Sequence, residues 1–316
     1  MTQGGRKTLV AGDTTVDLYP TNGGALAVGS RLEWHVGGTA TNAARWMAAL
    51  GGDVGLLTNV GDDTVGRAAA RHLAAGPVDT EHVTRVDATS PLTMYVPTAD
   101  GVRWEAWVAG SCYGFTPPDD PASFVAPYER VHVEGVTLPA EVNRTGVHRL
   151  VEAAVESDVR VSFDLNGRPN QWAGAESYRS ALGEVLPHCD LVFAGAEDLA
   201  VAGVDPTPAG LLELLPPDAT ATAFVTDGAA ETTAMTVVDG EVTERVTASP
   251  PAVTVATAAG AGDAFAGAVL AARDHGTADV GALAAIGNAA GAAAVTTVGP
   301  FDPDAPATAA RLLRRS

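Results

Sequence analysis

Short apolar runs rich in β-branched residues alternate along the chain with segments whose apolar residues recur at helical spacing. The expected strands are Lys7–Ala11, Val54–Leu57, Arg130–Val133, Val159–Phe163, Leu191–Phe193 and Ala223–Val225. Between the first two, the apolar positions Ala43, Ala44, Met47 and Leu50 share one face of a helix. Such alternation is typical of a parallel sheet covered by helices on both faces. The sequence therefore predicts an α/β fold, a three-layer sandwich with a mostly parallel central sheet.

Two stretches interrupt this alternation. The first, Leu18–Val36, is irregular, whereas the second, Pro91–Gly114, contains β-like runs around a turn. These runs are Leu92–Pro97 and Val102–Val108, and the turn is Ala99-Asp100-Gly101. We expect a small antiparallel sheet that stands off the main one as a lid, from segments at about 14–36 and 91–114. Since there is no long linker or repeat, residues 1–316 are predicted to form one domain.

The chain is strongly acidic. Asp and Glu number 38 against 19 Lys and Arg, which gives a formal net charge of −19, and Lys7 is the only lysine. This charge repels nucleic acids and anionic membranes, so neither is expected as a partner. A GC-rich genome alone does not explain the acidic excess, and we favour adaptation to a halophilic cytoplasm. The N-terminal sequence has no signal-peptide pattern, so a cytoplasmic location is expected.

The octapeptide Gly260–Gly267, with the sequence GAGDAFAG, is the strongest candidate for a functional motif. A β-compatible run, Val253–Val255, precedes it, and apolar residues at helical spacing follow, so it is expected at a helix N-terminus. Free amides and the positive dipole end suit a phosphate there. Asp263 could accept a proton from an attacking hydroxyl. A tight turn followed by an ordinary helical aspartate fits the octapeptide equally well.

Two weaker motifs precede this octapeptide. Gly37-Gly38 followed by Asn42 could bind a hydroxylated ligand, and Asp164-Leu165-Asn166-Gly167-Arg168 follows an expected strand, where α/β folds bind ligands. A capped helix and an Asx turn are the plain structural alternatives. The chain lacks the GxxxxGK[ST] motif of P-loop enzymes, and its first strand lacks the GxGxxG dinucleotide fingerprint.

In combination, these motifs resemble the PfkB, or ribokinase-like, carbohydrate kinase family over about Thr8 to Pro300. The likeness also includes Gly12–Asp17 and the G-x-D-x-x-G turn within Asn59–Gly66. The spacing of Asp164, Asn166, Arg168 and Trp172 resembles the fructokinase and 2-keto-3-deoxygluconate kinase branches.

The resemblance implies a ribokinase-like fold and ATP-dependent phosphorylation of a sugar hydroxyl, with ATP and Mg²⁺ bound. It implies catalysis by Asp263 as the base, with an anion hole of Gly260, Ala261 and Gly262. The implied substrate-binding residues are Asp17, Gly37, Gly38, Asn42 and Arg168. The implied nucleotide-binding residues are Asp164, Asn166, Thr226, Gly228 and Asn288, and Glu197 is the implied magnesium-linked residue. A homodimer through the lid is a further expectation.

Three departures from the family pattern affect these expectations. Thr257-Ala258 replaces the usual Asp-Thr, so an activating monovalent cation is not expected, and Ala194 replaces the Asn of Asn-x-x-Glu. The lid has no arginine in Trp104–Gly110 for a substrate carboxylate, although Trp104 and Trp107 could pack against a sugar. The alternatives are a sugar- or nucleotide-binding regulatory protein with lost or weak turnover, and a nucleoside kinase.

Overall fold

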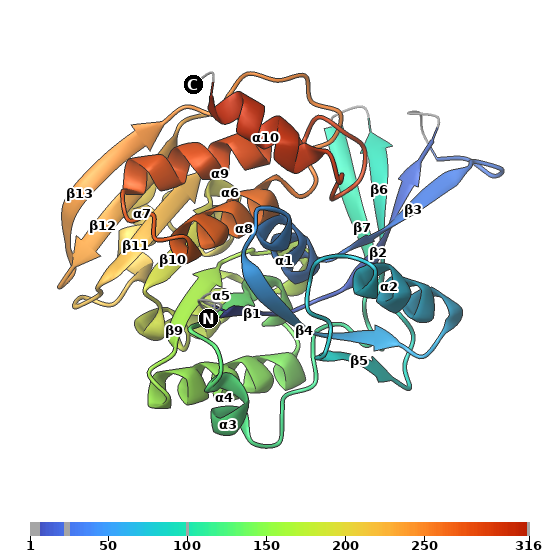
Figure 1. The fold of residues 1–316 in the computed structure, drawn as a ribbon, viewed down its shortest axis with the longest axis horizontal. Coiled ribbons are helices and arrows are strands. Elements are labelled where there is room, and N and C mark those ends of the chain that lie inside the picture. Colours follow the sequence, from blue (N-terminus) through green and yellow to red (C-terminus); the bar gives the residue numbers. More distant parts are fainter. Residues whose placement is uncertain (1–6, 22–25, 99–100, 315–316) are drawn as a thin grey trace, which may run out of the picture.

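A nine-stranded sheet forms the centre of the molecule (Figure 1). The computed structural model describes residues 7–21, 26–98 and 101–314. The sheet has the strand order β13-β12-β11-β10-β9-β8-β1-β4-β5. The strands are β1 Lys7–Ala11, β4 Asp53–Gly61, β5 Val83–Val86, β8 Arg130–Glu134, β9 Arg160–Asp164, β10 Leu191–Gly195, β11 Ala221–Thr226, β12 Thr232–Val238 and β13 Glu241–Ala248. Pairing is parallel from β5 to β11 and antiparallel from β11 to β13, which confirms the predicted mostly parallel sheet.

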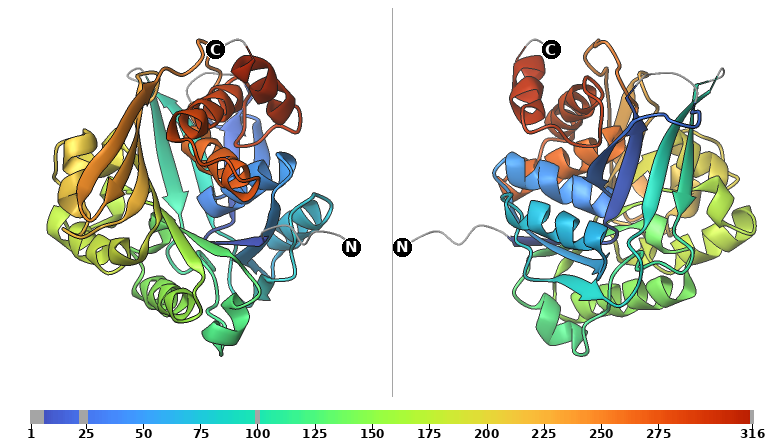
Figure 2. Two further views of the ribbon diagram at one scale, coloured as in Figure 1. Left: turned by 60° about the vertical axis from the view of Figure 1, so that its left-hand side comes forward. Right: turned by 90° about the vertical axis from the view of Figure 1, so that its right-hand side faces the viewer.

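Helices cover both faces of this sheet, so the three predicted layers are present (Figure 2). One layer consists of α1 Thr39–Ala49, α2 Thr64–Ala74, α8 Ala261–Asp274 and α9 Val280–Ala294, with α10 Ala305–Leu313 packed outside α9. The other consists of α3 Pro121–Val125, α4 Glu141–Glu156, α5 Ala175–Gly183, α6 Ala196–Val201 and α7 Pro208–Leu214. Three short 3-10 helices are Gly135–Thr137, Pro169–Gln171 and Leu186–His188.

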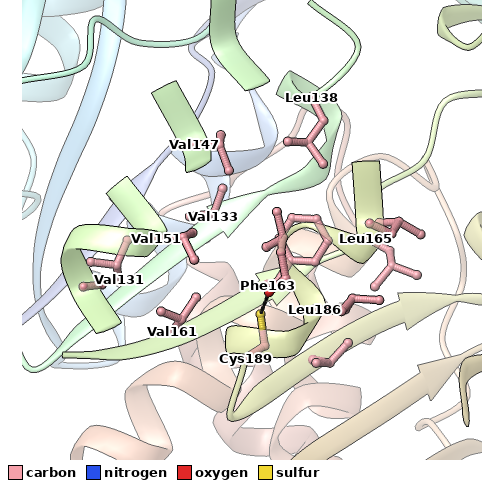
Figure 3. Packing of buried hydrophobic residues seen from close by; sticks show 14 of the residues in the cluster. Val131, Val133, Leu138, Val147, Val151, Val161, Phe163, Leu165, Leu186 and Cys189 are labelled. Carbon is pink, nitrogen blue, oxygen red and sulfur yellow. Dashed lines mark hydrogen bonds between the residues drawn. The ribbon is translucent and has the colours of Figure 1, made fainter. Parts of the chain in front are cut away.

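The central strands are apolar on both faces because both faces are buried. On one face, Val133 of β8 and Phe163 of β9 lie in a cluster with Val147 and Val151 of α4 (Figure 3). On the other, Phe193 of β10 belongs to a cluster with α1, α8 and α9. This double burial gives the strands their continuous apolar runs, which is why the sequence located them.

The lid is a separate four-stranded sheet in the order β3-β2-β6-β7. Its strands are β2 Thr15–Pro20, β3 Leu32–Gly37, β6 Leu92–Thr98 and β7 Gly101–Trp107. The sheet stands away from the central sheet beyond α1 and α2 (Figure 1). It is mixed rather than antiparallel, because the middle pair, β2 and β6, leave the body in the same direction and pair in parallel. The turn predicted at Ala99-Asp100-Gly101 includes residues 99 and 100, which lie outside the described residues.

The β-compatible run Val253–Val255 does not form a strand. The chain there has neither helix nor strand, because β13 is already the sheet edge and Val255 is 62% exposed. Most of the apolar segment Ala282–Val298 lies in the buried helix α9, which ends at Ala294. Within the described residues, no helix is long and apolar enough to cross a membrane.

Candidate active site

The N-terminus of α8 has free backbone amides and an exposed residue, Gly262. Gly260 caps the helix with a φ of 75°, and a Cβ there would come within 2.8 Å of the Pro300 carbonyl oxygen. The amides of Ala261, Gly262 and Asp263 have no hydrogen-bond acceptor among the described residues. Nothing lies within 4 Å of a Cβ placed on Gly262. Free amides at the positive end of a 14-residue helix suit an anion such as a phosphoryl group.

Asp263, in the first turn of this helix, is tied to α1. The Asn42 side-chain amide donates a hydrogen bond of 2.7 Å to Asp263 Oδ2, and both side chains are buried. Burial and the nearby Glu134 carboxylate hold the pKa of Asp263 well above its usual range, against the effect of the Asn42 bond. A carboxyl group with a raised pKa is suited to accept a proton near neutral pH. Asn42 Oδ1 is buried without a hydrogen-bond partner among the described residues, so it can accept a bond from a ligand.

The lid brings Asp17 to the same region. Thr15 and Thr93 each donate a hydrogen bond of 2.6 Å to Asp17 Oδ1, which fixes the carboxylate between β2 and β6. A Cβ at Gly37 would collide with this carboxylate, so the position requires glycine. Gly38 has a φ of 103°, which also favours glycine. The Gly-Gly pair therefore lets the lid carboxylate approach the start of α1.

Asp13 supports the start of α1 and was not among the predicted site residues. Its Oδ1 accepts hydrogen bonds from the Thr39 hydroxyl at 2.9 Å and from the Ala40 amide at 3.2 Å. Burial raises the pKa of Asp13 to about 6, and the two bonds act in the opposite direction. The sequence signal was its place directly after the first buried strand, where parallel sheets gather their functional groups.

Glu134, at the carboxyl end of β8, is a second residue that the sequence did not single out. It is fully buried, and it lies 3.2 Å from His132 Nε2 and accepts a 3.0 Å bond from the Asn166 amide. Its charge contributes to the raised pKa values of Asp164 and Asp263, after burial as the larger cause. Asn166, predicted to contact the nucleotide, therefore uses its side-chain NH₂ to hold Glu134.

Arg168 and Asp198 form the next part of the site. Asp198 is buried and accepts 2.7 Å bonds from the amides of Gly167 and Gly195. Burial raises the pKa of Asp198 to about 6 against these bonds and the nearby Arg168. Burial lowers the pKa of Arg168, but neighbouring carboxylates, first among them Asp198, raise it by more, so the guanidinium stays charged. Asp198 was missed because a lone acid in a first helical turn is usually an ordinary capping residue.

Two of the predicted nucleotide residues lie at the carboxyl ends of β9 and β11, the strands on either side of β10. Asp164 ends β9, Thr226 ends β11, and Gly228 follows with a φ of 52°. Burial, together with Glu134, holds the pKa of Asp164 well above its usual range. Asn288 lies apart from this row in α9. Its Oδ1 accepts a 2.6 Å bond from Thr232, and its NH₂ donates to the Ala248 carbonyl at 2.9 Å, so this side chain joins α9 to the antiparallel strands.

Glu197, the predicted magnesium-linked residue, is exposed in the first turn of α6 beside buried Asp198. Among the residues the structure describes, no group of three or more His, Cys, Asp or Glu side chains could hold a metal. Mg²⁺ is commonly bound through nucleotide phosphates with only one or two carboxylates. One exposed carboxylate at this position therefore fits an ion carried by the nucleotide rather than a metal held by the protein alone.

Two of the departures from the family pattern lie inside the fold. Thr257 is buried, and its hydroxyl accepts a 3.2 Å bond from the Ala259 amide, so it supports the turn before α8. Ala194 is buried in β10 and packs in the core cluster on the α4–α7 side. Neither position offers a carboxylate or an amide side chain to a ligand.

The chain has relatives over almost its whole length. Residues 6–307 match the model of a family described as "pfkB family carbohydrate kinase". A fructokinase of Klebsiella pneumoniae is 34% identical over 93% of this chain and 94% of its own length. A 2-dehydro-3-deoxygluconokinase of Thermoproteus tenax is 28% identical over 60% of this chain and 59% of its own. The structure of a fructokinase with bound ATP from Xylella fastidiosa superposes with a TM-score of 0.84 at 21% identity, over 98% of both chains.

Proposed function

Because the chain belongs to the pfkB family of carbohydrate kinases, which are ATP-dependent phosphotransferases, we propose that it phosphorylates a hydroxyl of an uncharged sugar, with fructose as the first acceptor to test. The observation that carries this proposal is the bond between Asn42 and Asp263 beside the free amides of α8. This arrangement combines a proton acceptor in Asp263, an Asn42 oxygen that is unpaired within the described residues and can accept a bond from a sugar hydroxyl, and an anion site at the helix end.

The residues of this chain bind the sugar, accept its proton and stabilise the charge of the transferred group. When bound, Mg·ATP supplies the γ-phosphoryl group and neutralises part of its charge. Asp263 accepts the proton of the sugar hydroxyl as that oxygen bonds to phosphorus and the bond to the ADP leaving group breaks. The amides of Ala261, Gly262 and Asp263 stabilise the charge on the transferred group. Arg168 adds a positive charge on the same side, and Asp17 and Asn42 orient the sugar.

The charge of the sugar side supports an uncharged acceptor. Four buried carboxyl groups surround the proposed sugar site, and they disfavour a negatively charged group on the sugar. These groups belong to Asp13, Asp17, Glu134 and Asp263. The lid side chains from 103 to 107 include one arginine, Arg103, which is exposed and paired with Glu105. The 34% identity to a fructokinase supports the same choice.

The second candidate is a sugar- or nucleotide-binding regulator with weak turnover. It is supported by Thr257 and Ala194, two positions where side chains that the family uses for ligands are replaced. An ADP-release assay over fructose, ribose, 2-keto-3-deoxygluconate and nucleosides separates the two functions. Binding without ADP release would favour the regulator, and release with a nucleoside alone would contradict a sugar kinase.

The decisive variant is Asp263→Asn, because an asparagine oxygen can still accept the Asn42 bond while the proton acceptor is lost. We expect turnover to fall by about 10²- to 10⁴-fold with the thermal midpoint nearly unchanged. Asp274→Asn makes the same change at the far end of α8, where Asp274 accepts a bond from Thr8 at 3.3 Å, and should keep its activity. If Asp263→Asn stays within tenfold of the parent, Asp263 is not the base.

We also propose a halophilic, cytoplasmic protein that dimerises through the outer face of its lid. The excess of acidic residues supports the halophilic character. Two exposed tryptophans support the dimer, since they lie on the lid face opposite Asp17. Trp34 is 48% exposed and Trp107 is 51% exposed. Light scattering of the parent and of Trp34→Ser tests the dimer. A monomeric parent would rule it out.

A further inference from the structure

Tyr19 lies on the inner face of the lid, two residues after Asp17 in β2. Side chains of a strand alternate between faces, so Asp17 and Tyr19 point the same way. The 2.6 Å bond from Thr93 to Asp17 shows that the alternate positions of β6, including Tyr95, share this face. Trp104 pairs with Tyr95 across β6 and β7 and belongs to it as well. The inner face therefore presents three aromatic rings next to the Asp17 carboxylate.

The Tyr19 ring is held on three sides. It stacks on Tyr95 with ring centroids 5.4 Å apart, and it meets His35 and Trp104 edge-on at 5.3 and 6.0 Å. The residue is only 2% exposed. Such packing fixes the direction of the phenol, so its hydroxyl has little freedom to find a partner elsewhere.

That hydroxyl has no hydrogen-bond partner among the described residues, although it is buried. A buried hydroxyl without a partner is costly and calls for an explanation, of which an absent ligand is one. Burial first, and then the Asp17 carboxylate, raises the pKa of Tyr19, so the phenol keeps its proton. It is therefore a hydrogen-bond donor among groups that mainly accept.

A second buried polar atom without a hydrogen-bond partner in the described part of the chain, Asn42 Oδ1, lies at the same site. Asn42 Oδ1 is buried and unpartnered within the described residues, while its NH₂ is committed to Asp263. The Asp263 carboxylate is the last of the causes that raise the pKa of Tyr19, after burial, Asp17 and Tyr95, so the free donor on the lid and the free acceptor on α1 both lie near Asp263. A sugar can satisfy both at once, because each of its hydroxyl groups donates and accepts.

We propose that the Tyr19 hydroxyl donates a hydrogen bond to an oxygen of the bound sugar, and that Tyr19 is a specificity-determining residue of the lid. This inference rests on the proposed function. The oxygen is a different one from the reacting oxygen, since the reacting hydroxyl must face Asp263. Tyr19 thereby selects acceptors that carry an oxygen at one particular position.

The test is Tyr19→Phe, which removes one oxygen and keeps the ring. With D-fructose and ATP, we expect KM for the sugar to rise about fivefold to twentyfold, with kcat within threefold and KM for ATP unchanged. The thermal midpoint should stay the same or rise, because an unpaired buried hydroxyl is lost. Tyr95→Phe, which removes a hydroxyl from the ring stacked on Tyr19, is the matched control and should leave KM unchanged.

Monodeoxy analogues of D-fructose give an independent readout. One analogue should raise KM for the parent enzyme by a similar factor, yet Tyr19→Phe should use that analogue about as well as fructose. A purely structural role for Tyr19 would not produce this selective loss of discrimination.

Several results would overturn the inference. They are an unchanged KM in Tyr19→Phe, an equal rise in Tyr95→Phe, and a rise in KM accompanied by a lower thermal midpoint. A parent enzyme that phosphorylates no sugar would refute the proposed function itself. An active parent with an unaffected Tyr19→Phe would refute only the role of Tyr19.

Discussion

Replacing Asp63 with alanine should destabilise the protein by about 3 kcal/mol and loosen the base of the lid. Asp63 caps α2, where its Oδ1 accepts a 2.7 Å bond from the Gly66 amide. The same carboxylate accepts bonds from the Ser90 amide at 2.7 Å and the Ser90 hydroxyl at 2.9 Å. The next residue, Pro91, accepts a bond from Val16 of β2, so Asp63 anchors the segment that leads into β6 and is bonded to β2.

The magnitude follows from these three bonds. Loss of an N-cap costs about 1 kcal/mol. Each bond from Ser90 to the charged carboxylate is worth about 1 kcal/mol, below the usual range for a bond to a charged group, because Asp63 is partly exposed and water can replace the lost partner. In a domain of this size, about 3 kcal/mol corresponds to a fall of roughly 5 °C in the thermal midpoint.

The pH dependence has a definite sign. Partial burial raises the pKa of Asp63, but the bonds from Gly66 and Ser90 lower it by more, so the net shift is downward. A carboxyl group with a lowered pKa in the folded state stabilises the protein above its ordinary pKa. That stabilisation is lost as the pH falls through the folded-state pKa. The difference between the parent and Asp63→Ala should therefore be full at neutral pH and shrink only in strong acid.

Urea denaturation at pH 7 and pH 3, with sugar KM measured at pH 7, tests this reasoning. Asp120→Ala is the matched control, because Asp120 also caps a helix and binds the amide and hydroxyl of one serine, Ser123. Its helix is short and the carboxylate is exposed, so little change is expected in either measurement. Equal losses in both variants, or a loss below about 1 kcal/mol in Asp63→Ala, would refute the anchoring role.

Two predictions follow from charge. The thermal midpoint should be higher in molar KCl than at low salt, because salt screens repulsion in a chain with a net charge of −19; a midpoint that does not rise would contradict a halophilic surface. Turnover should differ little between KCl and NaCl at equal concentration, because Thr257 offers a hydroxyl already bonded to Ala259 instead of a carboxylate. A several-fold preference for potassium, with the folded fraction equal in both salts, would show that backbone carbonyls suffice.

The sequence predicted the central sheet because burial on both faces leaves a direct record in apolar runs. It predicted the helix start at Gly260 because small residues followed by apolar residues at helical spacing have few other structural explanations. The sequence did not predict the bounds of β2 and β3. One reason is that β2 carries Asp17 on its buried face, and a buried carboxylate interrupts the apolar alternation of a strand.

The parts of the site that escaped prediction depend on contacts between distant segments. Glu134 accepts a hydrogen bond from the Asn166 side chain, and Asp198 accepts one from the Gly167 amide. The two partners of each bond are about 30 residues apart in the sequence. A single acid at the end of a strand or in a first helical turn has no local pattern that separates function from capping. The β-compatible run Val253–Val255 has the local composition of a strand but does not form one, since such a run forms a strand only where a neighbouring strand is available.

The bond between Asn42 and Asp263 joins residues 221 positions apart. The two helices that carry them are in close contact, since a Cβ at Gly267 of α8 would collide with the Ala43 carbonyl of α1. Closing so long a loop is a late and slow event in folding, and during synthesis it must wait until α8 has left the ribosome. The proposed proton acceptor and its partner therefore meet only when nearly the whole chain has folded, so that sugar turnover would report completed folding rather than the formation of any one part.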